Sequence, residues 1–147
     1  MIRELAYEEL NTASQVLWKS FYEAEKHNHT MAGMELFRDL TSPVSLSINT
    51  FQSGVVLYGY FENDAMLAVG ALKEKKHILM LYVLPGEQGK GIGKKLLAFM
   101  EELCEGELIT LNSSDSAISF YQRSGFSVCG ERNDRDGLIS TPMEKKK

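Results

Sequence analysis

The segment from Gln88 to Lys94 carries the residues best suited to chemistry. It reads Gln-Gly-Lys-Gly-Ile-Gly-Lys and follows a Pro-Gly turn at the end of an apolar run. Apolar residues at helical spacing begin directly after it, so we expect this segment to open a helix. A helix N-terminus presents unpaired N–H groups, and glycines lack the Cβ atom that would keep an anion away. The segment therefore predicts a cradle for a phosphate or pyrophosphate, with lysines at its rim.

Two common nucleotide-binding motifs do not fit this segment. A P-loop requires glycine and Ser or Thr where the chain has Gln88 and Lys95. A dinucleotide fingerprint requires a third glycine where Lys94 stands, and an acidic residue about 20 positions later, where Leu111 and Asn112 lie. A function that depends on ATP or NAD is therefore disfavoured.

Gln88, Gly91 and Gly93 form the spacing Gln-x-x-Gly-x-Gly, after a strand that ends in Val83-x-Pro85. This combination resembles the pyrophosphate-binding motif and the fourth-strand end of the GNAT N-acetyltransferase superfamily. The later segment Asn112-Ser113-Ser114-x-x-Ala117-x-x-Phe120-Tyr121-x-x-x-Gly125-Phe126 resembles its fifth strand and fourth helix. The resemblance is strongest from about Val55 to Met143. It implies a single α/β (α+β) N-acetyltransferase domain over 1–147, with one mixed, mostly antiparallel sheet and helices on both faces.

The resemblance also implies that the protein binds acetyl-CoA as acyl donor and uses no metal. In the family the pantetheine arm lies between the splayed fourth and fifth strands, where its amides can pair with the fourth strand. The cofactor-binding residues that it implies are Leu81, Tyr82, Val83, Gln88, Gly89, Lys90, Gly91, Ile92, Gly93, Lys94 and Asn112. For Asn112, a turn-forming asparagine before a helix is the competing interpretation.

Two residues are predicted to move protons. Tyr121 matches the family tyrosine that protonates the departing CoA thiolate, and a plain core tyrosine is its competing interpretation. His77 opens the fourth strand and is the predicted base, although the family usually has a carboxylate near this position. With regular alternation its side chain shares a face with Leu79, Leu81 and Val83. A strand-end histidine that caps a turn is the competing interpretation.

A cluster of ionisable residues lies where the first two helices are expected to meet. Its members are Glu23, Glu25, His27 and His29. These side chains could bind a cationic amine or relay a proton on the acceptor side. A solvated, charged helix end is the simpler interpretation, because such residues are mostly exposed. No third ligand accompanies the two histidines, so a metal site is not predicted.

Periodicity predicts the elements that position these residues, in the order β-α-α-β-β-β-α-β-α-β-β. Helices are expected over 7–26, 30–40, 91–103 and 115–124, with Thr30 capping the second and Pro43 ending it or starting a short helical stretch. Strands are expected over 2–5, 55–61, 65–72, 77–83, 107–111, 127–132 and 138–143, the last two joined by an Asp-Gly turn. The apolar strands should be covered by helices on both faces.

Composition narrows the function further. The chain has 147 residues and a net charge of −4, so a nucleic-acid partner is not expected. Cys104 and Cys129 lack metal-ligand spacing and are expected to be small core residues. The N-terminus lacks the apolar run of a signal peptide and no run is long enough to cross a bilayer, so we expect a cytoplasmic protein with no membrane partner. The lysine-rich end, residues 144–147, is expected to be solvated.

Two functional hypotheses follow. The first is an N-acetyltransferase in which a primary amine attacks acetyl-CoA directly, with a small molecule, peptide or protein as acceptor. The second is an acyl-CoA-binding sensor or regulatory module of the same fold that performs no chemistry. A homodimer is compatible with either hypothesis.

Overall fold

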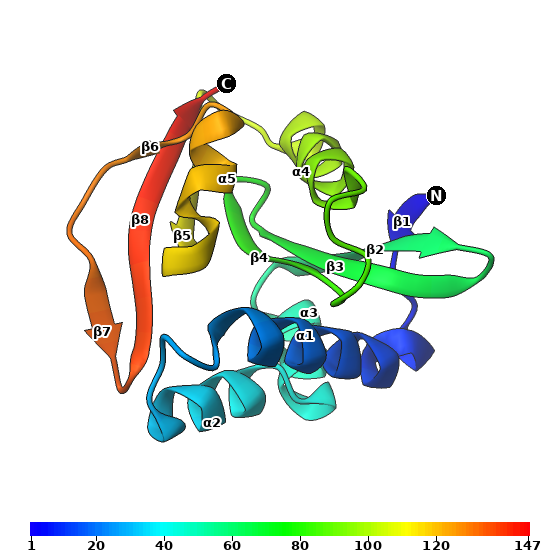
Figure 1. The fold of residues 1–147 in the computed structure, drawn as a ribbon. Coiled ribbons are helices and arrows are strands. Elements are labelled where there is room, and N and C mark those ends of the chain that lie inside the picture. The colour runs from blue at the N-terminus through cyan, green and yellow to red at the C-terminus, as the bar shows by residue number, and fades with distance from the viewer.

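The computed structural model describes residues 1–147 as five α-helices, two short 3₁₀ helices and eight strands (Figure 1). The helices are α1 (Leu10–Glu25), α2 (Met31–Leu40), α3 (Pro43–Gln52), α4 (Ile92–Leu103) and α5 (Ile118–Arg123), with 3₁₀ helices η1 (Tyr7–Glu9) and η2 (Asp115–Ala117). The strands are β1 (Ile2–Glu4), β2 (Val55–Glu62), β3 (Ala65–Lys73), β4 (His77–Val83), β5 (Leu108–Ser113), β6 (Ser127–Val128), β7 (Asn133–Arg135) and β8 (Leu138–Lys146).

The strands form one sheet in the order β1-β2-β3-β4-β5-β8-β6, and β7 pairs with the other end of β8. Every pairing is antiparallel except that of β4 with β5. The predicted mixed, mostly antiparallel sheet is thereby confirmed. None of the helices has the length and apolar character needed to span a membrane.

Helices cover both faces of the sheet, as predicted from the apolar strands. In Figure 1, α1, α2 and α3 lie below the sheet, whereas α4 and α5 lie above it. Two separate hydrophobic clusters fill these interfaces, one that includes Leu17 and Phe21 of α1 and one that includes Leu96 and Met100 of α4. Burying apolar surface on both faces is the main stabilising contribution to this fold.

Short polar signals fix where the helices begin. The Thr30 hydroxyl accepts a hydrogen bond from the Gly33 amide at 3.1 Å, which confirms the predicted cap of α2. Ser42 caps α3 in the same way, with Pro43 at the first helical position, so the helical stretch after this proline is also confirmed.

The β7–β8 hairpin turns at Asp136 and Gly137, which have φ of 53° and 89°. This matches the predicted Asp-Gly turn, because both central positions need positive φ. The turn packs on the start of α2, where a Cβ atom on Gly33 would lie 2.0 Å from the Gly137 oxygen. Glycine is therefore required at both positions for this close approach.

The C-terminal region differs from the prediction in two respects. The lysine-rich end is solvated as expected at Lys146 and Lys147, but it is not a free tail, because β8 continues to Lys146 and the Lys145 Nζ lies 2.6 Å from a Glu101 oxygen. Of the strand predicted over 127–132 only β6 (Ser127–Val128) forms, and β7 begins after the predicted range, at Asn133. The Cys129 amide still donates to the Pro142 oxygen, but Pro142 has no N–H to continue the ladder. Cys129 is also exposed, whereas Cys104 is buried as expected.

A β-bulge at Leu79 changes which side chains of β4 share a face. Ala71 pairs with Met80 while Leu72 pairs with Ile78, so Leu79 is the extra residue. Leu81 and Val83 consequently pack toward α4, and Met80 and Tyr82 pack toward α1. The expectation that His77 shares a face with Leu79, Leu81 and Val83 is wrong, because it assumed unbroken alternation.

Candidate active site

Backbone donors gather at the start of α4, in the turn that the sequence predicts to bind an anion. No backbone N–H from Gln88 to Lys94 donates to any protein group. Gly89 and Gly91 have φ of 80° and 79°, and a Cβ atom on either would meet no atom within 4 Å. This turn is open to solvent and is long enough to hold several anionic oxygens at the positive end of α4.

Side chains fix this turn against the end of β4. The Gln88 Nε2 donates to the Val83 oxygen at 3.3 Å, which joins the turn to the strand. Lys90 is occupied by an ion pair with Glu87 at 2.9 Å. Lys94 and Arg123 form no ion pair and face the cavity beside the turn, so their charges are free to meet an anion.

A cavity of about 610 Å³ runs from this turn along the gap between β4 and β5. The gap exists because the two strands pair only at His77 with Thr110 and at Ile78 with Leu111 before they separate. Every predicted cofactor-binding residue except Lys90 lines the cavity. Its volume lies in the range of small-molecule sites, which is roughly 300–1,000 Å³.

Tyr121 lies in the wall of this cavity and is itself almost fully buried. Its hydroxyl has no hydrogen-bond partner in the protein, although its ring is packed against Phe120 and Phe126. Burial raises the pKa of Tyr121 above its usual range, so the phenol keeps its proton at neutral pH. A fixed, protonated hydroxyl that faces a cavity can donate a proton or a hydrogen bond there.

Tyr82 of β4 also lines this cavity. Burial raises the pKa of the Tyr82 phenol, and the proximity of Tyr121 and Glu25 raises it further. Its ring is edge-on to Phe21 and Phe37, at centroid distances of 6.1 and 5.4 Å. This packing holds Tyr82 at the centre of the site.

The predicted base His77 lies at the far end of β4, and its side chain does not line the cavity. Its Nδ1 is 2.8 Å from the Thr110 hydroxyl, at the point where β4 and β5 pair. Burial, and then the neighbouring charge of Lys73, lower the pKa of His77 below its usual value. The imidazole is therefore neutral at pH 7, which a base requires, but it lies away from Tyr121.

A buried carboxylate, that of Glu25, lines the same cavity as Tyr121. The Glu25 side chain is 0% exposed and that of His29 is 1% exposed. The expectation of a solvated helix end is therefore wrong for these two residues. Glu23 and His27 of the same cluster are exposed. Glu25 and His29 are four residues apart, but so are the exposed Glu23 and His27, so this spacing could not identify the buried pair from the sequence.

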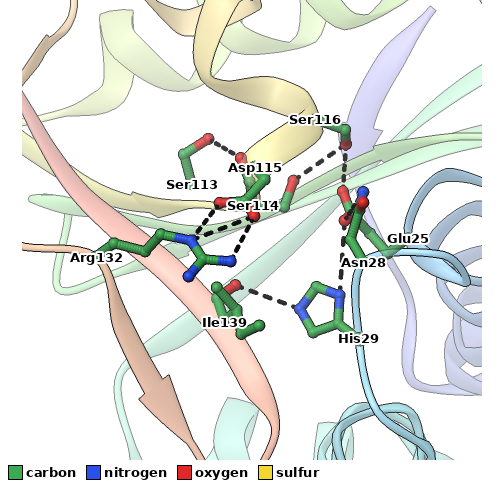
Figure 2. A network of polar contacts seen from close by, with 9 residues as sticks. All are labelled: Glu25, Asn28, His29, Ser113, Ser114, Asp115, Ser116, Arg132 and Ile139. Atoms are coloured by element: carbon green, nitrogen blue, oxygen red, sulfur yellow. Dashed lines mark hydrogen bonds and ion pairs between the residues drawn. The ribbon is translucent and has the colours of Figure 1, made fainter.

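Figure 2 shows how Glu25 is held. One carboxylate oxygen accepts from the Ser116 hydroxyl of η2, and the other accepts from the Asn28 Nδ2 at 3.3 Å. The His29 Nδ1 lies 3.6 Å from the carboxylate and has no hydrogen-bond partner, while its Nε2 contacts the Ile139 oxygen at 3.3 Å. Both Glu25 and Ser116 line the first cavity.

A second cavity, of about 390 Å³, lies on the side of β4 that faces α2 and α3. The two cavities share five lining residues, namely Leu79, Met80, Tyr82, Asn112 and Ser114. We call this shared region the junction. Two substrates that enter from opposite sides of β4 can therefore meet there.

No cluster of three or more His, Cys, Asp or Glu side chains is placed to hold a metal ion. The chemistry available to the described residues is therefore that of backbone donors, a phenol, a carboxylate and an imidazole. This set can bind an anionic group, protonate a leaving group and accept a proton.

Comparison with known proteins shows the family to which this fold belongs. Residues 19–147 match the acetyltransferase (GNAT) domain family. A GCN5-related N-acetyltransferase structure from Rhodopseudomonas palustris is similar in fold, with a TM-score of 0.88, 21% identity, and coverage of 99% of this chain and 94% of that one. The PaiA N-acetyltransferase from Thermoplasma acidophilum, solved in complex with coenzyme A, is similar at a TM-score of 0.81 and 26% identity over 100% and 98% of the two chains. The ribosomal-protein-S18-alanine N-acetyltransferase of Escherichia coli has a TM-score of 0.73 and 19% identity over 99% and 92%.

Proposed function

The chain belongs to the GNAT acetyltransferase family, and from this premise we propose that it transfers the acetyl group of acetyl-CoA to the nitrogen of an amine. The observation that carries this proposal is the run of unpaired N–H groups from Gln88 to Lys94 at the mouth of the first cavity. That arrangement suits a pyrophosphate, and the gap between β4 and β5 suits an extended arm with amide groups. A similar structure was solved with coenzyme A bound, which supports the same occupant here.

Acetyl transfer forms an amide C–N bond and breaks the thioester C–S bond, while one proton leaves nitrogen and one reaches sulfur. The Tyr121 hydroxyl supplies the proton to sulfur, since it is protonated, unpartnered and in the cavity wall. A backbone N–H near Val83 polarises the thioester carbonyl. No covalent acetyl-enzyme is needed, so an acetylated Cys104 or Cys129 should not accumulate.

In our proposal the proton on nitrogen passes from the junction through the Ser114 and Ser116 hydroxyls to the Glu25 carboxylate. Ser114 reaches the junction, its hydroxyl lies 3.4 Å from that of Ser116, and Ser116 donates to Glu25. A serine hydroxyl that donates to a carboxylate can accept a hydrogen bond from an amine at the same time. His77, the base predicted from the sequence, stays the alternative, and its position beside Thr110 would require a longer route.

Detection of free thiol from acetyl-CoA tests the proposed function. Wild-type protein is mixed with acetyl-CoA and pools of small amines, amino acids, polyamines, aminoglycosides or short peptides, with a reaction lacking amine as the control. Release above the control in any pool establishes the enzyme, and division of that pool identifies the acceptor. Binding of acetyl-CoA with no release from any pool would instead favour the binding-only module.

A further inference from the structure

The walls of the second cavity are mainly apolar at its inner end. Phe21 and Phe37 stack at a centroid distance of 3.7 Å, and Tyr82 completes this aromatic wall next to the junction. Leu138 and Ile139 of β8 line the opposite side. This inner end suits an acceptor with an apolar body between the junction and the outer end.

The charged residues that line this cavity have one sign. Lys73 at the end of β3 and Arg135 in β7 are its only charged lining residues, and neither forms an ion pair. No carboxylate lines the cavity, although the protein as a whole carries a net charge of −4. Two unpaired, exposed cations that line one cavity attract an anionic group and repel a second ammonium group.

The charge has the opposite sign on the other side of the junction. Glu25 lies in the wall of the first cavity, near Tyr82, and contacts no lysine or arginine. An acceptor amine at the junction therefore has a carboxylate on one side and two cations on the other. This polarity orients a molecule whose two ends differ in charge.

We propose that the second cavity binds a small amine that carries a carboxylate at the far end of an apolar body. The amine lies at the junction, and the carboxylate lies between Lys73 and Arg135. This inference rests on the proposed acetyl transfer and narrows its acceptor to amino acids of this shape. Polyamines and aminoglycosides, which bring further positive charges to Lys73 and Arg135, are poor acceptors.

Two series of matched acceptors test the inference. The flexible series is 6-aminohexanoate, hexylamine and 1,6-diaminohexane, and the rigid series is 4-(aminomethyl)benzoate, benzylamine and 1,4-bis(aminomethyl)benzene. Within each series only the far end changes. We expect kcat/KM from thiol release to fall from acid to neutral amine to diamine, by roughly tenfold or more between the first and the second.

Substitution of the two cations separates recognition from folding. We expect Arg135→Gln and Lys73→Gln to raise KM for the acids several-fold and to leave kcat/KM for the neutral amines unchanged. We expect Arg135→Glu to reverse the order, so that the diamines exceed the acids. A merely structural role of Arg135 would lower all three activities together. The exposed Arg38→Gln, in α2 and outside the cavity lining, is the matched control.

Failure of this inference and failure of the proposed function give different results. Turnover in which a diamine equals or exceeds the acid would overturn the acceptor class and leave acetyl transfer intact. If no acceptor reacts, calorimetry of the CoA-loaded protein decides the inference by itself. Acids that bind more tightly than diamines would then support the cavity assignment, while equal or absent binding would overturn it.

Discussion

Replacement of Glu25 by glutamine tests the proton route most directly. Glutamine has nearly the same shape, and its amide oxygen can still accept from Ser116 or Asn28. The substitution removes the proton acceptor and keeps the packing of α1 against η2. Because the carboxylate is buried without a lysine or arginine partner, the loss of its charge should cost little stability.

The expected loss of activity in Glu25→Gln follows from the protonation of the acceptor amine. An alkyl amine has a pKa of about 10.4, so at pH 7 roughly one molecule in 2,500 is neutral. General-base catalysis typically contributes about 10²–10⁴-fold. We therefore expect Glu25→Gln to lower kcat/KM for an alkyl amine by roughly 10²–10³-fold. Affinity for acetyl-CoA should be unchanged, because the phosphate turn lies at the other end of the cavity.

The decisive assay compares two nucleophiles of the same skeleton. The reacting amine and its alkoxyamine analogue, which is already unprotonated at pH 7, are both assayed by thiol release. The variant should lose most of its activity with the amine and little with the alkoxyamine. Glu23→Gln is the matched control, since Glu23 is exposed on the same helix and pairs only with Lys26.

Two results would refute this route. Equal losses with both nucleophiles would mean that Glu25 only supports the structure. A selective loss in His77→Gln, with Glu25→Gln active, would assign the proton to the histidine instead.

Three other predictions concern the cofactor turn, the acid and the N-terminal ion pair. Gly91→Ala should weaken acetyl-CoA binding at least tenfold and lower stability by about 1 kcal/mol. The control Gly106→Ala, at a similar positive φ of 86° in open space, should lower stability equally and leave the affinity unchanged. Equal affinities of the two variants by calorimetry would contradict the anion cradle. Tyr121→Phe should lower kcat roughly 10²-fold or more and leave acetyl-CoA affinity and Tm unchanged, because the hydroxyl has no protein partner; retained kcat would exclude it as the acid. Arg3 lowers the pKa of Glu9 to about 2 through their hydrogen bonds, so this pair stabilises the fold above pH 4.5 and the stabilisation is lost as the pH falls toward 2. The Tm difference between wild type and Arg3→Gln should therefore vanish between pH 4.5 and pH 2. A Tm difference that stays constant over this range would refute the pairing.

Local signals in the sequence were sufficient for most elements and for the open turn from Gln88 to Lys94, whose binding of phosphate stays a prediction. Gln88, Gly91 and Gly93 lie within one short segment, so their chemistry depends on neighbours along the chain. Thr30 and the Asp136–Gly137 turn are likewise decided by a few residues. Such features could be predicted because hydrogen bonds within a turn or a cap need no tertiary partner.

The remaining features of the site depend on contacts between distant segments. Glu25 is buried because η2, more than 80 residues later, covers it, and no local pattern distinguishes it from exposed Glu23. The bulge at Leu79 arises from register with β3, and it moved the predicted base to another face. The second cavity is lined by Lys73 of β3 and Arg135 of β7, which lie far apart in the chain. The sequence alone therefore could not show that these two cations line one cavity.

The short pairing of β4 with β5 also has a consequence for unfolding. Only two residue pairs join these strands, so the sheet consists of two parts with a narrow seam. The remaining links across it include Glu25 with Ser116, His29 with Ile139 and the Gly33–Gly137 contact. In the complex that we propose, the pantetheine arm spans this seam, so the free protein should open there first, with early amide exchange in β5. At a cofactor concentration of about 100 times Kd, binding adds about 2.7 kcal/mol to the free energy of unfolding and should merge the two parts into one cooperative unit.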